Sequence, residues 1–186
     1  MNTPAHMKTI TVFGGSSYAE ESDIYDAAYN LGKALAEKGF ALCNGGYGGT
    51  MEAAAKGVSE AGGRTIGVTL SDAPNRWIQE NKPQPDHWRR MQKLIERGDG
   101  YVVLPGGTGT LAELGVLLES INKGFLTRSP VVFLKHHWEP LLDVLGGEKL
   151  LQSDGVFRTV EGVEMRGAVA MTDTPEPAAE FLSRNL

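Results

Sequence analysis

Residues 103–113 read VLPGGTGTLAE, and they decide how the rest of this chain is interpreted. The residues before them, GDGYVVLP (98–105), are typical of a turn and a short buried strand, and those after them, LAELGVLLESI (111–121), are typical of a helix. A glycine loop between a strand and a helix lets backbone N–H groups converge on an anion, and the helix dipole adds favourable potential. The stretch therefore predicts a phosphate site.

The same alternation of apolar runs and helical periodicity continues along the whole chain. We expect strands in residues 9–15, 40–46, 64–70, 100–105 and 130–135, with a further strand and a helix in residues 168–186. We expect the other helices in residues 22–39, 47–63, 86–99, 110–124 and 138–147. Residues 71–85, SDAPNRWIQENKPQP, are polar and carry prolines, which indicates a surface loop or a lid.

Near-continuous apolar strands joined by helices imply a parallel sheet that is covered on both faces. The fold class predicted is therefore α/β, a Rossmann-like doubly wound parallel sheet with helices on both faces. At 186 residues the chain is long enough for one sizeable core, and we expect a single Rossmann-like nucleotide-binding domain over residues 1–186.

Charge and composition exclude several classes of partner. The net charge of −5, from 23 acidic and 18 basic residues, argues against nucleic acid. Cys43 is the only cysteine, which rules out an internal disulfide and fits a reducing compartment. No apolar run approaches the roughly 20 residues needed to span a bilayer, and no secretory signal is visible. We therefore expect a soluble, cytoplasmic protein with no membrane partner.

Three glycine-rich loops follow expected strands, namely FGGSS (13–17), NGGYGGT (44–50) and PGGTGT (105–110). None is a Walker loop, since no Gly-Lys-Ser/Thr follows, and the first strand is not followed by G-x-G-x-x-G. Tight turns alone would also use such glycines. Because the carboxyl ends of parallel strands share one edge of the sheet, three such loops favour a ligand that carries phosphate.

Glu113 has two possible roles. Thr110 and Glu113 match a capping box, with Thr110 at the N-cap and Glu113 at the third helical position. A glutamate beside a phosphate site is otherwise electrostatically unfavourable, which makes Glu113 a candidate for chemistry. The residue types alone leave both roles open.

The expected helix in residues 86–99 offers a cation to complement Glu113. Asp86 is a plausible N-cap, and helical periodicity places Trp88, Met91, Leu94 and Ile95 on one apolar face. Arg90 borders this face, so it either presents its guanidinium to a cleft or remains an ordinary surface arginine.

These motifs resemble a known family. PGGTGTLAE (105–113) fits the PGGxGTxxE signature of the Lonely Guy (LOG) family, which comprises cytokinin riboside 5′-monophosphate phosphoribohydrolases that are often mislabelled lysine decarboxylases. VFGGSS (12–17), NGGYGGTMEAAAKGV (44–58) and WRRMQKLIERGDGYVVLPGG (88–107) resemble its first loop, its second loop and its arginine helix. Molybdenum-cofactor carrier proteins are similar to the signature too.

The resemblance implies a role for each matching residue. It makes Arg90 and Glu113 the catalytic residues. It assigns the 5′-phosphate cradle to Gly106, Gly107, Thr108, Gly109 and Thr110, and the nucleotide cleft to Gly15, Ser16, Gly46, Gly48 and Gly49. Two departures concern the cytokinin preference: Met91 stands where the family often has lysine, and residues 45–52 read GGYGGTME instead of a sequence like GGGSVGLMG.

The activity implied is hydrolysis of the N-glycosidic bond of a cytokinin or purine nucleoside 5′-monophosphate, giving a free base and ribose 5-phosphate. The implied ligand is AMP-like, no metal or cofactor is required, and a homodimer or a higher homo-oligomer is expected. The alternative is a non-catalytic carrier that binds a nucleotide or the molybdenum cofactor. Adjacent histidines 136 and 137 point to different sides and make a poor metal site.

Overall fold

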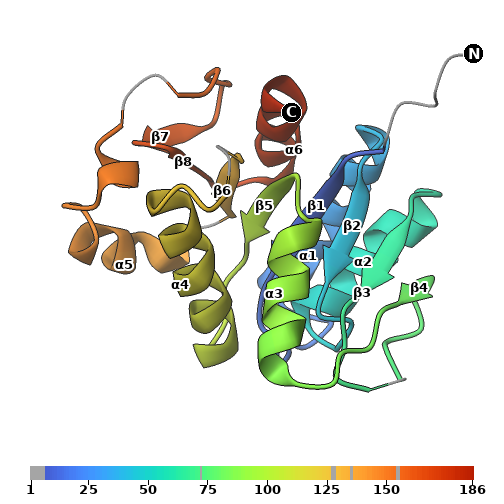
Figure 1. Ribbon diagram of the computed structural model, residues 1–186. Coiled ribbons are helices and arrows are strands. Elements are labelled where there is room, and N and C mark those ends of the chain that lie inside the picture. The colour runs from blue at the N-terminus through green and yellow to red at the C-terminus, as the bar shows by residue number, and fades with distance from the viewer. Residues whose placement is uncertain (1–6, 72, 127–128, 135, 154–155) are drawn as a thin grey trace, which may run out of the picture.

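The computed structural model describes residues 7–71, 73–126, 129–134, 136–153 and 156–186. Its strands are β1 Thr9–Phe13, β2 Ala41–Asn44, β3 Thr65–Gly67, β4 Glu80–Asn81, β5 Gly100–Val103, β6 Val131–Leu134, β7 Glu164–Arg166 and β8 Val169–Thr172 (Figure 1). Its α-helices are α1 Asp23–Glu37, α2 Thr50–Glu60, α3 His87–Arg97, α4 Thr108–Asn122, α5 Glu139–Val144 and α6 Pro175–Asn185. Two 3₁₀ turns, η1 His136–Trp138 and η2 Lys149–Leu151, complete these elements.

The strands form one sheet in the order β4-β3-β2-β1-β5-β6-β8-β7. Neighbouring strands are parallel except β7, which runs antiparallel to β8. The chain moves outward from β1 to β2 in one direction and continues from β5 in the other, so strand order reverses between β1 and β5. In sheets of this kind, ligands bind beyond the carboxyl ends of the strands at the reversal. Phe13 pairs with Val103 there, so the loops after β1 and β5 leave the sheet side by side.

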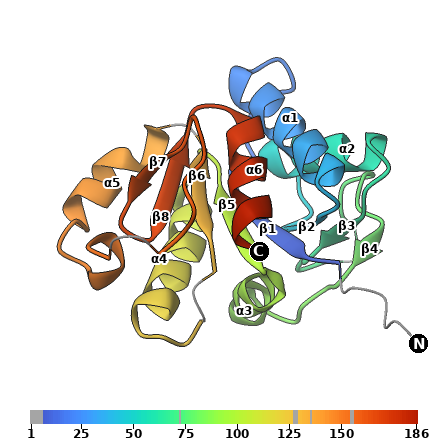
Figure 2. The same ribbon diagram turned by 90° about the horizontal axis from the view of Figure 1, so that it is seen from above.

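Helices cover both faces of the sheet, with α1, α2 and α6 on one face and α3 and α4 on the other (Figure 2). The prediction of a doubly wound α/β sheet is therefore confirmed. Within the part of the chain that the structure describes, none of the helices has the length and apolarity that crossing a bilayer requires.

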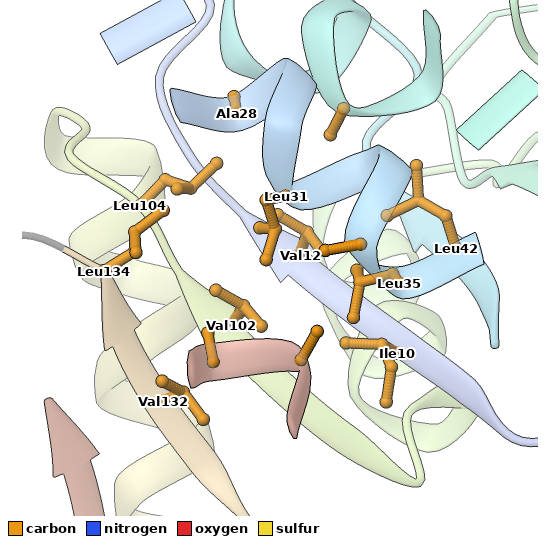
Figure 3. Close-up of a cluster of buried hydrophobic side chains, with 14 of the residues drawn as sticks. Ile10, Val12, Ala28, Leu31, Leu35, Leu42, Val102, Leu104, Val132 and Leu134 are labelled. Carbon is orange, nitrogen blue, oxygen red and sulfur yellow. The ribbon is translucent and has the colours of Figure 1, made fainter. Parts of the chain in front are cut away.

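Each face of the sheet has its own hydrophobic core. On the α1 side, Leu31 and Leu35 pack with Ile10 and Val12 of β1 (Figure 3). On the other side, α3, α4 and α5 pack on alternate residues of the same strands, such as Phe13 of β1. Because both faces are buried, the central strands carry the near-continuous apolar runs seen in the sequence.

The two short edge strands were not expected from the sequence. β4 lies within the predicted loop 71–85 and pairs with β3 through Ile66 and Glu80. β7 reads Glu-Met-Arg and is partly exposed. Edge strands are not buried on both faces, so these two carry charged residues and lack the apolar run that marks a central strand.

Candidate active site

The loops after β1 and β5 touch at the carboxyl edge of the sheet. Gly15 N donates a hydrogen bond to the Pro105 carbonyl at 3.1 Å. A Cβ on Gly15 would lie 3.2 Å from the Cα of Gly106, and a Cβ on Gly106 would lie 3.0 Å from Gly15 N. Glycine at both positions therefore permits the close approach of the two loops.

A polar cleft of about 600 Å³ opens beside this contact. Its lining comes from the loops after β1, β2 and β5 and from α2, α3 and α4. The lining residues are Gly14, Gly15, Ser16, Ser17, Tyr18, Tyr47, Met51, Arg90, Gly106, Gly107, Thr108, Gly109, Thr110 and Glu113. A cleft of this size is within the usual range for small-molecule sites.

Arg90 enters the cleft wall from the first turn of α3. The Asp86 carboxylate caps this helix by accepting a hydrogen bond from Arg89 N at 2.8 Å, as the sequence predicted. Arg90 is only 6% exposed, and its Nε donates to the Val68 carbonyl at 2.8 Å. Placing Trp88 on the buried face was wrong: it is 73% exposed, because the buried part of α3 begins only at Arg90.

Glu113 faces Arg90 from α4, and the predicted capping box is wrong. The helix begins at Thr108 with Gly107 as its N-cap, so Thr110 lies inside the first turn instead of capping it. Glu113 is 8% exposed, and its Oε1 accepts a hydrogen bond from Arg90 Nη1 at 3.3 Å. Burial raises the pKa of Glu113 to about 7, although Arg90 acts to lower it. The carboxyl group can therefore change its protonation state near neutral pH.

The amino end of α4 opens on the same cleft. No side chain caps it and its first turn carries no acidic residue. Gly107 and Gly109 have no other atom within 4 Å of the place where a Cβ would lie, so packing within the described chain does not require glycine at either position. The first N–H groups of a helix have no partner within the helix, and those in the wall of a cleft are suited to an anion.

The second glycine loop adjoins the first, and the expected role of its glycines in the nucleotide cleft stays a prediction. Gly46, Gly48 and Gly49 are not among the residues that line the cleft. Gly46 and Gly49 have positive φ values of 75° and 63°, and a Cβ on Gly49 would lie 2.5 Å from the Gly15 carbonyl oxygen. These glycines shape the loop and support the first one, where Thr50 N and Oγ1 donate to the same Gly15 carbonyl at 3.0 and 3.1 Å.

Several residues of the cleft wall were not expected from the sequence. Tyr47 and Met51 line the cleft from the second loop and the start of α2, and Tyr18 lines it from the first loop. Tyr47 interrupts the glycines of NGGYGGT, which is the one signal that could have singled it out. The cleft brings together the other predicted residues, which are Gly15, Ser16, Arg90, Gly106, Gly107, Thr108, Gly109, Thr110 and Glu113. Their roles in binding and catalysis stay predictions.

Other reactive groups lie elsewhere. Cys43 is fully buried in β2, and burial raises the pKa of its thiol to about 12, so it is not activated. Among the described residues, no group of three or more His, Cys, Asp or Glu side chains is placed to hold a metal ion.

Solved structures share this fold. The molybdenum cofactor binding protein from Rippkaea orientalis superposes with a TM-score of 0.72 over 95% of each chain, at 22% sequence identity. At that identity, the likeness establishes the fold and nothing further.

Sequence relatives include proteins with described activities. A probable cytokinin riboside 5′-monophosphate phosphoribohydrolase of Oryza sativa subsp. japonica is 32% identical over 98% of this chain and 75% of its own length. A cytokinin riboside 5′-monophosphate phosphoribohydrolase of Rhodococcoides fascians is 27% identical over 90% of each chain. A protein of Archaeoglobus fulgidus described as uncharacterized is 32% identical over 66% of this chain and 82% of its own. The chain spans about half to three quarters of the rice relatives that it matches.

The model of the SLOG cluster4 family matches residues 7–144. This span includes all three glycine loops, the helix of Arg90 and the helix of Glu113. The match covers well over half of the chain, and the protein therefore belongs to the SLOG cluster4 family.

Proposed function

We propose that this protein hydrolyses the N-glycosidic bond of a nucleoside 5′-monophosphate and releases a free base and ribose 5-phosphate. The observation that carries the proposal is the buried pair of Arg90 and Glu113 in the wall of a cleft that also holds the amino end of α4. The relatives from rice and Rhodococcoides fascians, whose names state this activity, support it.

The amino end of α4 is the proposed phosphate site. Gly107 and Gly109 present backbone at the cleft with no side chain of their own in the way, and the helix dipole favours a dianion there. Glu113 follows on the same helix, where Leu111 N closes the first turn onto the Gly107 carbonyl at 2.9 Å. Phosphate held at the helix start would therefore bring the attached ribose toward the Glu113 carboxyl group.

Cleavage of an N-glycosidic bond passes through a transition state with positive charge on the sugar C1′ and its ring oxygen. The bond from C1′ to the base nitrogen breaks, water adds to C1′, and the departing base takes up a proton. We assign the Glu113 carboxylate to stabilise this positive charge or to orient the water. Arg90 holds that carboxylate in place by its hydrogen bond at 3.3 Å.

The proposed assembly is a homodimer or a higher homo-oligomer. Leu111 and Val116 on α4 are 41% and 39% exposed, and Trp88 on α3 is 73% exposed. Helices α3 and α4 cover the same face of the sheet (Figure 2), and a second copy packed on this face would cover part of this exposed apolar surface. Analytical ultracentrifugation is expected to give a dimer or larger, and Val116→Lys is expected to shift the distribution toward monomer. A wild-type monomer at micromolar concentration would contradict this assembly.

Incubation of the purified protein with nucleotides tests the activity. AMP and an N6-prenylated AMP are supplied in parallel with the two ribosides that lack the 5′-phosphate, and chromatography follows the free base and ribose 5-phosphate. We expect release from a monophosphate and little from its riboside, because the phosphate anchors the sugar. Binding of the nucleotides without release of base would overturn the proposal and favour a carrier of nucleotides or of a related cofactor.

A further inference from the structure

Tyr47 lies against the guanidinium of Arg90. It comes from the loop between β2 and α2, and Arg90 Cζ is 5.3 Å from the centroid of its ring. A guanidinium at this distance from a phenol ring is attracted by the electron-rich face of the ring. Both side chains also line the cleft, so the contact belongs to its wall.

Tyr47 is itself held by the chain between β3 and β4. Its hydroxyl accepts a hydrogen bond from Leu70 N at 2.9 Å, and its carbonyl accepts one from Asn75 Nδ2 at 2.8 Å. Asn75 N also donates to the Gly46 carbonyl at 2.7 Å. The ring is therefore fixed at its hydroxyl end and at its backbone.

The other contacts of Arg90 do not fix its guanidinium completely, so the Tyr47 ring contributes to its position. Nε is fixed by the Val68 carbonyl at 2.8 Å, whereas Nη1 is 3.3 Å from Glu113 Oε1, which is long for a hydrogen bond between charged groups. A Cβ on Gly45 would lie 2.0 Å from Nη2, so glycine is needed there to admit the guanidinium. The long hydrogen bond to Glu113 is thus supplemented by the Tyr47 ring, which restricts where the guanidinium can move.

We propose that Tyr47 is a positioning residue that holds the Arg90 guanidinium toward Glu113, and that Leu70 and Asn75 act on the ion pair through it. The effect of Tyr47 on the rate of turnover rests on the proposed function. Its effect on the contact between Arg90 and Glu113 does not. Without the ring, the guanidinium would move more freely and spend less time beside the carboxylate.

This loss of contact can be read from the titration of Glu113 without any substrate. Arg90 is the charged group that acts on this carboxyl among the described residues, and it lowers the pKa that burial raises. A guanidinium that is held less firmly lowers the pKa less. Tyr47→Leu is therefore expected to shift the titration midpoint of Glu113 upward by about 0.5 pH unit. The free energy of a contact between a cation and an aromatic ring corresponds to a shift of this size.

Nuclear magnetic resonance of protein labelled with ¹³C at the glutamate carboxyl carbon measures the midpoint, and Glu113→Gln assigns the signal. Tyr47→Phe keeps the ring but loses the hydroxyl bond to Leu70, so a smaller shift is expected. Tyr29→Leu is the matched control, because Tyr29 also lies beside a cation, with Lys56 Nζ at 5.7 Å, and donates its hydroxyl to Glu60. It lies on α1 and should leave the midpoint unchanged.

An unchanged midpoint in Tyr47→Leu would overturn the inference. Should that variant not fold, Tyr47→Met, which fills much of the volume but has no ring, decides in the same way. Turnover adds a second readout, in which kcat falls about tenfold while KM changes little. Absence of hydrolysis by the wild type would refute the proposed function and leave the titration result valid. Hydrolysis together with an unchanged midpoint would refute the role of Tyr47 alone.

Discussion

Arg90 Nη1 lies 3.3 Å from Glu113 Oε1, and both side chains are buried. The residues come from different helices, 23 positions apart in the chain. Removing both charges from water costs free energy that their attraction repays only in part, so a buried pair of this kind contributes little net stability. Its position in the wall of a polar cleft instead supports a functional role.

Replacing Arg90 by lysine keeps the charge but removes the planar fork that reaches Val68 and Glu113 together. We expect Arg90→Lys to lower kcat/KM by at least about tenfold, because the carboxylate loses its fixed partner. Steady-state kinetics with AMP measures this. Arg89→Lys is the matched control, since Arg89 is the exposed neighbour on α3 and should keep the wild-type rate. Equal losses in both variants would remove Arg90 from the mechanism.

The raised pKa of Glu113 predicts how stability depends on pH. The folded protein holds the Glu113 proton up to about pH 7, whereas an unfolded chain releases it near 4.5. The folded state binds more protons between these values, so the free energy of unfolding contributed by Glu113 falls as pH rises through this window. The wild type should lose about 3 kcal/mol relative to Glu113→Gln between about pH 4 and pH 8, and nothing more above that.

Urea unfolding at a series of pH values measures this difference. Glu119→Gln is the control, because Glu119 is on the same helix with a side chain that is 60% exposed, and it should follow the wild type. Parallel curves for the wild type and Glu113→Gln would show that Glu113 has an ordinary pKa.

Alanine substitutions at two glycines of α4 distinguish an effect on AMP binding from an effect on stability. An alanine at Gly109 or at Gly115 meets no other atom within 4 Å, and alanine favours a helix over glycine by about 0.5–1 kcal/mol. Both substitutions should therefore maintain or raise stability. Only Gly109 lines the cleft, so Gly109→Ala alone should weaken AMP binding, by about tenfold. Calorimetry measures both effects, and equal affinities in the two variants would place the phosphate elsewhere.

The sequence predicted the parts of the fold that rest on burial of apolar side chains. The central strands are buried on both faces, so their apolar runs were visible, and the Asp86 cap marked the start of α3 correctly. The edge strand at Glu80 was missed because two residues that are partly exposed carry no such signal.

The site was predicted less completely, since its contacts join distant segments. Thr110 and Glu113 fit a local capping pattern, yet the helix starts at Thr108, in a loop that also contacts Gly15 of a distant segment. The role of Tyr47 depends on Arg90, Leu70 and Asn75, which local periodicity cannot bring together. Family resemblance pointed to Arg90 and Glu113, whereas the residue types alone left both undecided.

Comparison of the wild type with Glu113→Gln, in turnover and in binding of AMP, tests the central claim most directly. Glutamine keeps the shape and can still accept a hydrogen bond from Arg90, but it cannot supply the negative charge. We expect kcat to fall at least about 100-fold while the dissociation constant of AMP stays within a few fold. Glu119→Gln should keep the wild-type rate. Hydrolysis by Glu113→Gln at close to the wild-type rate would contradict the assignment of Glu113 as the group that promotes cleavage of the glycosidic bond.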